Sequence, residues 1–350
     1  SSEFDIRNPS TWSLMNSAEF SRRIGWNSIE LLPHQFDAIV RIMTRIKREN
    51  MGTILALDMG LGKTIIAISI LAILKMWEQL KGPEQVVMPI GPVLVVMPKA
   101  LLVKDEWKGS ILQNSNFDTI NVFDPKQDIS SYKDCQIVLS SPGMVARNLH
   151  SFLSIQWSIL VYDEAHELRN GLLVDKPNPK AKRAMAFFEL SKRIRLNHGI
   201  ILPLTGTPIF NKETDFMAQL QFMGVDMADI LGEKNLTFRN KALLEMVDQY
   251  LIRGTKRDLL KLPPCSYFTH DLQLNKREIQ RARELFQELS NLNDQLNRID
   301  EKERVALMNS MRTVLLRLRQ LCVSSALIDS KERIETLYDS YGTLGTLGNI

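Results

Sequence analysis

The sequence predicts an α/β fold in which a parallel sheet is covered by helices on both faces and is followed by a mainly helical segment. Three observations support this prediction. Short β-branched runs alternate with helix-like stretches between about residues 30 and 225. These runs are almost continuously apolar, as expected for strands buried on both faces. After Pro263 and Pro264 the composition changes to long, charged helical sequence without strand signals.

Five apolar runs are the expected strands of the sheet. In open sheets of this kind, ligands bind beyond the carboxyl ends of the strands, so this edge is where we expect the chemistry. The five runs are Thr53–Leu57, Val93–Met97, Ile137–Ser140, Ser158–Tyr162 and Ile200–Leu204.

Composition limits the classes of function. The 350 residues contain 44 Lys and Arg against 40 Asp and Glu, and the net charge of +4 does not by itself indicate a polyanion partner. The longest apolar stretch, Ile65–Leu74, is shorter than the roughly 20 residues of a membrane span, so we expect a buried helix and no membrane partner. The spacing of the cysteines excludes a zinc site and a disulfide framework and favours a reducing compartment. These are Cys135, Cys265 and Cys322.

The first expected strand runs into the glycine-rich segment Asp58-Met59-Gly60-Leu61-Gly62-Lys63-Thr64, and a helix-forming stretch follows. Gly60 and Gly62 allow a tight turn that brings backbone N–H groups close to phosphate oxygens, and the helix adds the positive end of its dipole. Lys63 is expected to reach the β- and γ-phosphates, and the Thr64 hydroxyl to bind Mg²⁺. The whole segment, Asp58 to Thr64, is the expected ATP-binding loop.

This loop is shorter than a strict eight-residue phosphate-binding motif, which would place glycine where the chain has Leu57. The alternative interpretation is a glycine turn that only connects a strand to a helix. The downstream residues argue against this alternative.

The strand Ser158–Tyr162 ends in Asp163-Glu164-Ala165-His166. Asp163 is suited to hold Mg²⁺, and Glu164 is suited to orient and deprotonate the attacking water, because phosphoryl transfer needs positioning and charge neutralisation. We therefore expect Glu164 and Lys63 to be catalytic and to face one cleft. The alternative is that both acids face solvent.

A third strand, Ile200–Leu204, ends in Thr205-Gly206-Thr207-Pro208, which brings hydroxyl groups and a tight turn to the same edge. Alone, this segment indicates only a turn. The order and spacing of the three strand ends carry the prediction of a common site.

With these motifs the chain resembles a superfamily 2 helicase, and specifically the first RecA-like lobe of the SWI/SNF-type ATP-dependent DNA translocases. Asp58–Thr64 resembles motif I, residues 163–170 resemble motif II and residues 204–211 resemble motif III. Leu32-Pro33-His34-Gln35 resembles the upstream element in which the glutamine recognises adenine, and residues 95–102 with Trp107 resemble motif Ia. Residues 251–256, 262–264 and 316–322 resemble the helical segments between the two lobes of the family.

The resemblance implies roles for further residues. It implies that Gln35 binds the adenine of ATP, and that His166 couples hydrolysis to movement together with Thr205, Gly206 and Thr207. It also implies that Lys99, Ser140 and Ser141 contact one strand of double-stranded DNA. Lysine and serine at strand ends suit contacts with the phosphate backbone, which do not depend on base identity.

The chain departs from the family pattern at several positions. Leu57 and Asp58 stand where the family commonly has Asp-Glu, and Arg253-Gly254 stands where it often has paired arginines. The second RecA-like lobe is absent from the 350 residues. Because an arginine finger contributes roughly 10³ to 10⁵ in rate, we expect this chain to bind ATP and hydrolyse it slowly without a second lobe in cis.

We expect four segments. Residues 1–27 form an N-terminal extension that can include a cloning remnant, and 28–260 form the ATP-binding lobe. Residues 261–330 form a helical segment, in which Leu285, Leu289, Leu292, Leu296 and Ile299 line one helix face, and 331–350 are a flexible tail or the start of lobe 2. We expect the seam to pack within a helical hairpin, with an intermolecular coiled coil as the alternative.

The predicted function is the motor lobe of a double-stranded DNA translocase that remodels chromatin or displaces proteins from DNA, with ATP and Mg²⁺. The alternatives are a strand-separating DNA or RNA helicase lobe, and a nucleotide-gated interaction module that binds a protein partner through the helices of residues 276–322. The resemblance implies a nuclear location, with a virus or another DNA-containing compartment as alternatives.

Overall fold

The computed structural model describes residues 5–14, 16–24, 30–79, 91–170, 182–209, 213–227, 236–261, 263, 266, 268–269, 274–296 and 301–323. The chain divides into two compact units, Ser1–Pro263 and Pro264–Ile350, and each is described by itself. Ile299, the last residue of the expected seam, and the tail from residue 331 lie outside the described residues.

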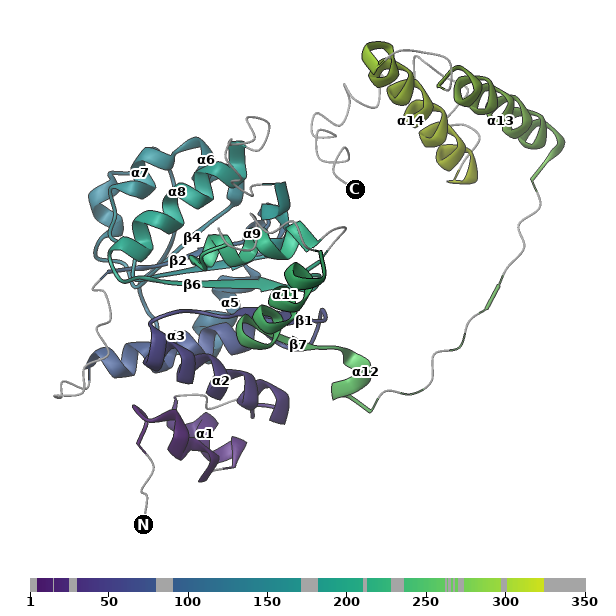
Figure 1. The fold of residues 1–350 in the computed structure, drawn as a ribbon. Coiled ribbons are helices and arrows are strands. Elements are labelled where there is room, and N and C mark those ends of the chain that lie inside the picture. The colour runs from purple at the N-terminus through teal and green to yellow at the C-terminus, as the bar shows by residue number, and fades with distance from the viewer. Residues whose placement is uncertain are drawn as a thin grey trace. The chain divides into compact units, whose positions relative to one another are not determined.

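The first unit contains a seven-stranded sheet in the order β3-β4-β2-β5-β6-β1-β7 (Figure 1). All neighbouring strands run parallel, which confirms the predicted fold class. All seven carboxyl ends therefore lie at one edge. The strands are β1 (Ile54–Leu57), β2 (Val93–Val96), β3 (Ile120–Val122), β4 (Ile137–Ser140), β5 (Ile159–Asp163), β6 (Ile200–Thr205) and β7 (Leu251–Gly254).

Helices and short 3₁₀ segments connect the strands. In the first unit they are η1 (Pro9–Leu14), α1 (Ser17–Arg23), α2 (Pro33–Glu49), α3 (Lys63–Gln79), α4 (Lys99–Val103), α5 (Glu106–Asn114), η2 (Ile129–Tyr132), α6 (Pro142–Arg147), α7 (Leu149–Leu153), η3 (Ala165–Asn170), α8 (Lys182–Leu196), α9 (Glu213–Met223), α11 (Leu236–Tyr250) and α12 (Lys256–Leu259).

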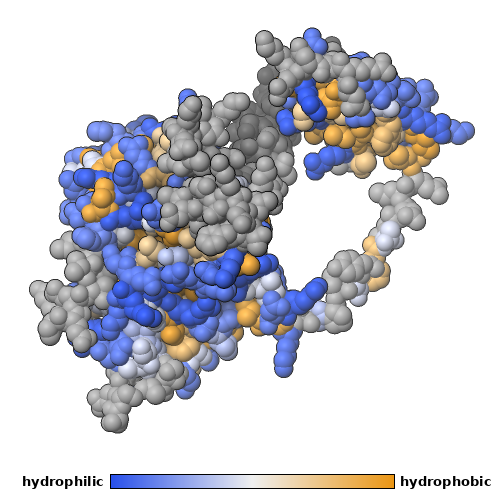
Figure 2. Space-filling model, viewed as in Figure 1, coloured by the Kyte–Doolittle hydropathy of each residue, from blue (hydrophilic) through white to orange (hydrophobic). Residues whose placement is uncertain are grey.

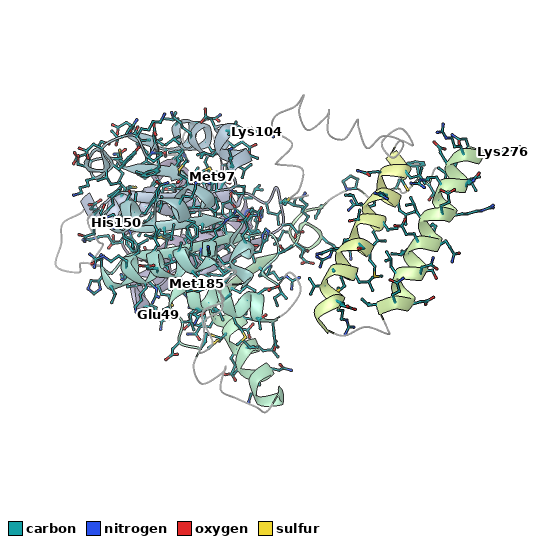
Figure 3. The ribbon with its side chains drawn as sticks, turned by 90° about the horizontal axis from the view of Figure 1, so that it is seen from above. Glu49, Met97, Lys104, His150, Met185 and Lys276 are labelled. Carbon is teal, nitrogen blue, oxygen red and sulfur yellow. The ribbon has the colours of Figure 1, made fainter. Side chains whose placement is uncertain are left out.

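The sheet separates two hydrophobic cores because side chains of a strand alternate between its faces. In β1, Leu55 and Leu57 pack with α2, α3 and α5, whereas Ile54 and Ala56 pack with α8, α9 and α11. Figure 1 shows α2 and α3 on one side of the sheet and α6, α7 and α8 on the other. Helix α3 is buried along most of its length, as predicted for Ile65–Leu74. Met97, which follows β2, lies in the interior, and Lys104 and His150 lie at the surface (Figure 3).

The structure contains all five predicted strands and two further ones, β3 and β7. The assignment of residues 251–256 to a helical segment between lobes is wrong for Leu251–Gly254, which pair in parallel with β1 as an edge strand. Gly254 makes this close approach possible, because a Cβ there would lie 2.9 Å from Leu57 Cδ2 and 2.4 Å from Leu259 Cδ1.

The second unit contains α13 (Lys276–Leu296) and α14 (Glu301–Val323), which lie side by side (Figure 3). Leu285, from the expected seam, is fully buried, and Val314 and Leu321 of α14 are also buried. Figure 2 shows apolar surface on this unit. Phe286 and Leu316 are among its exposed apolar side chains. Within the described residues, no helix has both the length and the apolar character that crossing a membrane requires.

Two glycines give opposite stability predictions. A Cβ at buried Gly52, which precedes β1, would lie 1.9 Å from the Ile201 carbonyl oxygen, whereas exposed Gly109 in α5 has nothing within 4 Å of that position. Gly52→Ala should therefore lower the free energy of unfolding by about 3 kcal/mol, through overpacking against backbone. Gly109→Ala should raise it by about 0.5–1 kcal/mol, because alanine loses less backbone entropy in a helix.

Urea unfolding followed by tryptophan fluorescence measures both changes, because all five tryptophans belong to the first unit. A Gly52→Ala protein as stable as the wild type would contradict the packing of β1 against β6.

Candidate nucleotide-binding site

The phosphate loop (Asp58–Thr64) connects the end of β1 to the start of α3. Gly60 and Gly62 have left-handed backbone angles, with φ of +84° and +86°. A Cβ at Gly62 would lie 2.2 Å from Gln35 Nε2, so glycine is also required there for close packing. The first turn of α3 contains no acidic residue. The loop therefore presents backbone N–H groups and the positive end of a helix dipole, which together favour an anion.

Lys63, the first residue of α3, points back under the loop. Its Nζ donates a hydrogen bond to the Leu57 carbonyl oxygen at 2.8 Å. The same Nζ lies 3.9 Å from the position of a Cβ at Gly206, which follows β6. The ammonium group is thus held between the carboxyl ends of β1 and β6.

Gln35 and His34, at the start of α2, both contact the carbonyl oxygen of Leu61 in the loop. Gln35 Nε2 donates to it at 3.3 Å, and His34 Nε2 lies 3.1 Å away. Gln35 Oε1 accepts a bond from the Leu32 N–H at 2.9 Å and so caps the helix. The residue expected to bind adenine therefore lies beside the phosphate loop and is buried.

The other loop residues differ in exposure. Met59 is exposed and Leu61 is buried in the core. Asp58 Oδ2 accepts a hydrogen bond from the backbone N–H of Lys256 at 2.9 Å, and the Asp58 N–H donates to the Gly254 carbonyl at 3.1 Å. The start of the loop is therefore fixed to the segment that follows β7.

Asp163 is the last residue of β5 and is buried. Its Oδ2 accepts a hydrogen bond from the Trp107 indole N–H at 3.0 Å, and its Oδ1 accepts one from the Glu164 N–H at 3.0 Å. Burial raises the pKa of the Asp163 carboxyl, while the Trp107 hydrogen bond and the nearby Lys63 charge act in the opposite direction. The carboxylate is thus shielded from water, and the cost of burying its charge is partly offset by these hydrogen bonds and by Lys63.

Glu164 has a left-handed backbone, with φ of 58°. Its Oε2 lies 3.1 Å from His166 Nδ1. This contact with His166 holds the pKa of the Glu164 carboxyl below its usual value, and the Lys63 charge and the Gly206 N–H act in the same direction. Glu164 is therefore ionised at neutral pH, as a base must be, and shares its surroundings with Lys63.

A hydroxyl from the end of β6 meets the acidic segment. Thr205 is fully buried, and its Oγ1 lies 3.4 Å from His166 Nδ1 and accepts the Thr207 N–H at 3.0 Å. The Gly206 N–H also stabilises the Glu164 carboxylate. These contacts connect the residues at the end of β5 directly with those at the end of β6. The four residues expected to couple hydrolysis to movement lie in one network.

The donors present fit Mg²⁺ bound together with phosphate. Asp163 offers a buried carboxylate, and Thr64, half-buried in the first turn of α3, offers a hydroxyl. Over the described ranges, no group of three His, Cys, Asp or Glu could hold a metal. Mg²⁺ commonly takes one or two carboxylates and completes its shell with substrate phosphates and water, so a preformed cage is not needed.

The three residues expected at DNA lie at the ends of β2 and β4. Lys99 is exposed at the start of α4. Ser140 and Ser141 are buried, with 1% and 8% of their surface exposed. Of the three, only Lys99 is exposed to solvent.

The sequence resemblance places Trp107 with motif Ia and Lys256 in the segment 251–256, but it gives neither residue a role at this site. Trp107 and Asp163 are 56 positions apart, and Lys256 and Asp58 are 198 apart. Spacing along the chain carries no signal for either contact. Lys256 would have been found by recognising β7 as a strand, because its carboxyl end then falls at the same edge as the loop.

The fold and these contacts define a nucleotide-binding α/β protein of the phosphate-loop class. The sequence pattern of the SNF2-related domain matches residues 34–327, so the chain belongs to the SNF2-related domain family and contains its first RecA-like lobe.

Two relatives illustrate the similarity. Human DNA repair and recombination protein RAD54B is 29% identical over 223 residues, which cover 61% of this chain and 22% of that protein. The mouse SWI/SNF-related matrix-associated actin-dependent regulator of chromatin subfamily A member 1 is 26% identical over 302 residues, covering 80% and 25%. The chain thus spans about a quarter of the length of these relatives.

Among solved structures, the Sulfolobus solfataricus SWI2/SNF2 ATPase core in complex with dsDNA matches with a TM-score of 0.50 and 20% identity. The match covers 91% of this chain and 65% of that one. At this identity the similarity concerns the fold.

The Trp107–Asp163 contact gives a pH-dependent prediction. Trp107→Phe removes a donor to a buried carboxylate, so at pH 7 it should lower the free energy of unfolding by about 2 kcal/mol. Asp163 is ionised only above its raised folded-state pKa, and as the pH falls through that value the protonated carboxyl needs the donor less. The difference in the free energy of unfolding between Trp107→Phe and the wild type should therefore become smaller at acid pH.

Trp157→Phe is the matched control, because this buried indole donates to the uncharged Phe152 carbonyl at 2.8 Å. Its effect on urea unfolding should not change with pH. Parallel pH profiles for the two variants would contradict the assigned role of the Trp107 N–H.

Proposed function

We propose that this chain is the ATP-binding motor lobe of an ATP-dependent double-stranded DNA translocase that acts in chromatin remodelling or protein displacement. The observation that supports this most directly is the convergence of Lys63, Asp163 and Glu164 at the carboxyl ends of β1 and β5, next to a loop suited to phosphates. Membership of the SNF2-related domain family agrees with this chemistry.

In the proposed reaction the chain binds the triphosphate through the backbone of Gly60 and Gly62 and the ammonium group of Lys63. Lys63 exchanges its bond to the Leu57 carbonyl for a phosphate oxygen, which leaves that carbonyl beside the loop. Glu164, which is ionised, accepts a proton from the water that attacks the γ-phosphorus; the bond to the β–γ bridging oxygen breaks, and ADP and inorganic phosphate are released. Gln35 contacts the adenine from the start of α2.

Asp163 and Thr64 are the proposed ligands of Mg²⁺. When bound, the ion neutralises charge that develops on the phosphate oxygens. Trp107 fixes the orientation of the Asp163 carboxylate by its hydrogen bond at 3.0 Å. The orientation of this ligand therefore depends on packing between α5 and β5.

His166 contacts both Glu164 and Thr205, so we propose that it senses the state of the γ-phosphate and passes it to Thr205, Gly206 and Thr207. The remaining component is a second RecA-like lobe in cis that supplies arginines to the γ-phosphate. Without it, hydrolysis by this chain is proposed to be at least about a hundredfold slower than with it, since an arginine finger contributes roughly 10³ to 10⁵ in rate.

Two substitutions separate binding from hydrolysis. Lys63→Ala removes the cation that reaches the phosphates and should weaken Mg-ATP binding by at least about tenfold, an energy of about 1.4 kcal/mol. Glu164→Gln keeps the shape of the base and removes its proton-accepting charge, so it should retain binding and lose hydrolysis. Calorimetry with Mg-ATP and single-turnover phosphate release measure the two properties.

Neither variant should lower the unfolding midpoint by more than a few degrees, which serves as the folding control. Full Mg-ATP affinity in Lys63→Ala would remove the assignment of that lysine. Unchanged turnover in Glu164→Gln would remove the assignment of the base. A Glu164→Gln protein that loses hydrolysis but keeps its function would favour a nucleotide-gated interaction module.

Double-stranded DNA is the proposed substrate because the chain belongs to the SNF2-related domain family and the similar archaeal ATPase core is described in complex with dsDNA. Within this chain, Lys99 is the proposed phosphate contact, since it is exposed at the end of β2. Ser140 and Ser141 line the end of the neighbouring β4 and, being buried, contribute only if that edge opens. A nuclear location and a protein partner for the helices of residues 276–322 belong to the same proposal.

Lys99→Glu should weaken duplex binding for every sequence and should reduce the slope of log K against log salt by about 0.9, the value for one phosphate contact. Lys133→Glu is the matched control, because Lys133 is also exposed but precedes β4 and so lies at the opposite edge of the sheet. Fluorescence anisotropy with duplex, single-stranded DNA and RNA measures the slopes. Equal slopes for both variants would contradict the contact, and a preference for single strands or RNA would favour a strand-separating helicase.

A further inference from the structure

The segment after β7 brings an additional lysine to the phosphate loop. β7 pairs in parallel with β1, with Gly254 opposite Leu57, so both strands end at the same edge. Thr255 caps the short helix α12, and Lys256 is the first residue of this helix. The loop is therefore flanked by β6 on one side of β1 and by the end of β7 on the other.

Two hydrogen bonds fix the backbone of this segment to the loop. The Lys256 N–H donates to Asp58 Oδ2 at 2.9 Å, and the Gly254 carbonyl accepts the Asp58 N–H at 3.1 Å. Neither bond uses the Lys256 side chain. Any substitution of Lys256 other than proline therefore keeps both hydrogen bonds to Asp58 and changes only the side chain beside the loop.

The side chain of Lys256 extends along the loop toward Gly60. Its Cε and Nζ each lie 3.6 Å from the position that a Cβ at Gly60 would occupy. Both residues are exposed, so this part of the loop is open to a ligand. Across the ranges that the structure describes, no carboxylate forms an ion pair with this ammonium group.

The two lysines lie beside different parts of the loop. Lys63 Nζ is directed to the Leu57 carbonyl and toward Gly206 after β6, and Lys256 Nζ lies beside Gly60 after β7. A single cation at a phosphate loop already favours an anion. A second one, carried by a segment whose backbone is hydrogen-bonded to the loop, raises the positive potential beside Gly60.

We propose that Lys256 is a second phosphate-binding cation, which contacts the polyphosphate of the nucleotide from the β7 side of the loop. This inference rests on the proposed function. Because the interaction is with phosphate charge, its contribution should increase with the number of phosphates and be absent for adenosine.

The test is calorimetric titration of the 350-residue chain with Mg-ATP, Mg-ADP and adenosine. Lys256→Ala should weaken Mg-ATP binding by about tenfold, the size of one charge-assisted hydrogen bond at an exposed site. The loss should be smaller for Mg-ADP and absent for adenosine. Lys256→Arg should restore most of the affinity, because it returns a cation to the same position.

Arg257→Ala is the matched control. Arg257 is the next residue of α12 and is also exposed, so the substitution removes the same charge from the same helix. Its affinity for Mg-ATP should equal that of the wild type. Thermal unfolding of the Lys256 and Arg257 variants should be unchanged, since the backbone bonds to Asp58 remain.

The outcomes are distinct. Wild-type affinity in Lys256→Ala, equal losses in both alanine variants, or an equal loss for ATP and adenosine would each overturn this inference and leave the proposed function intact. If the wild-type chain itself does not bind Mg-ATP, both proposals fail together. Loss confined to Lys256→Ala and graded by phosphate number supports the assignment.

Discussion

The site depends on one constraint, the parallel pairing of β1 with β6 on one side and β7 on the other. Parallel strands bring their carboxyl ends to one edge, so residues far apart in the chain meet there. Lys63 follows β1, Thr205 ends β6 and Lys256 follows β7. β5 then pairs with β6 and brings Asp163 and Glu164 to the same edge. If any of these strands ran antiparallel, the functional residues at its carboxyl end would lie at the opposite edge of the sheet.

The charged side chains at this edge of the sheet already have partners within the protein. Asp163 is taken out of water and is compensated by an indole N–H, a backbone N–H and the nearby Lys63. Glu164 is paired with His166. The hydrogen-bond partner of the Lys63 ammonium group among the described residues is the neutral Leu57 carbonyl, a weaker partner than a phosphate, and the carboxylates of Asp163 and Glu164 lie near it. Lys63 can therefore still bind an anion strongly, whereas the carboxylates of Asp163 and Glu164 already accept hydrogen bonds from the protein.

The sequence predicted the elements whose signals are local. The buried strands, the glycine loop, the acids after β5 and the hydroxyls after β6 are each contained in a few consecutive residues, and the structure places them as neighbours. β7 was missed because it is four residues long and follows directly on α11, with no turn signal between them. The contacts of Trp107 and Lys256 could not be predicted, because they arise from packing between distant segments.

Glu164 shows how the fold maintains an unfavourable conformation at the site. A left-handed backbone at a residue other than glycine costs of order 1 kcal/mol, and it persists only where the surroundings determine it. Here three contacts do so: the Glu164 N–H donates to Asp163, the side chain pairs with His166, and the Gly206 N–H adds to the stabilisation of the carboxylate. An extended backbone at this position would continue the direction of β5 and carry the carboxylate away from Lys63. The strain is therefore the means by which adjacent acids on one strand reach two different positions, one buried beside Trp107 and the other facing the loop.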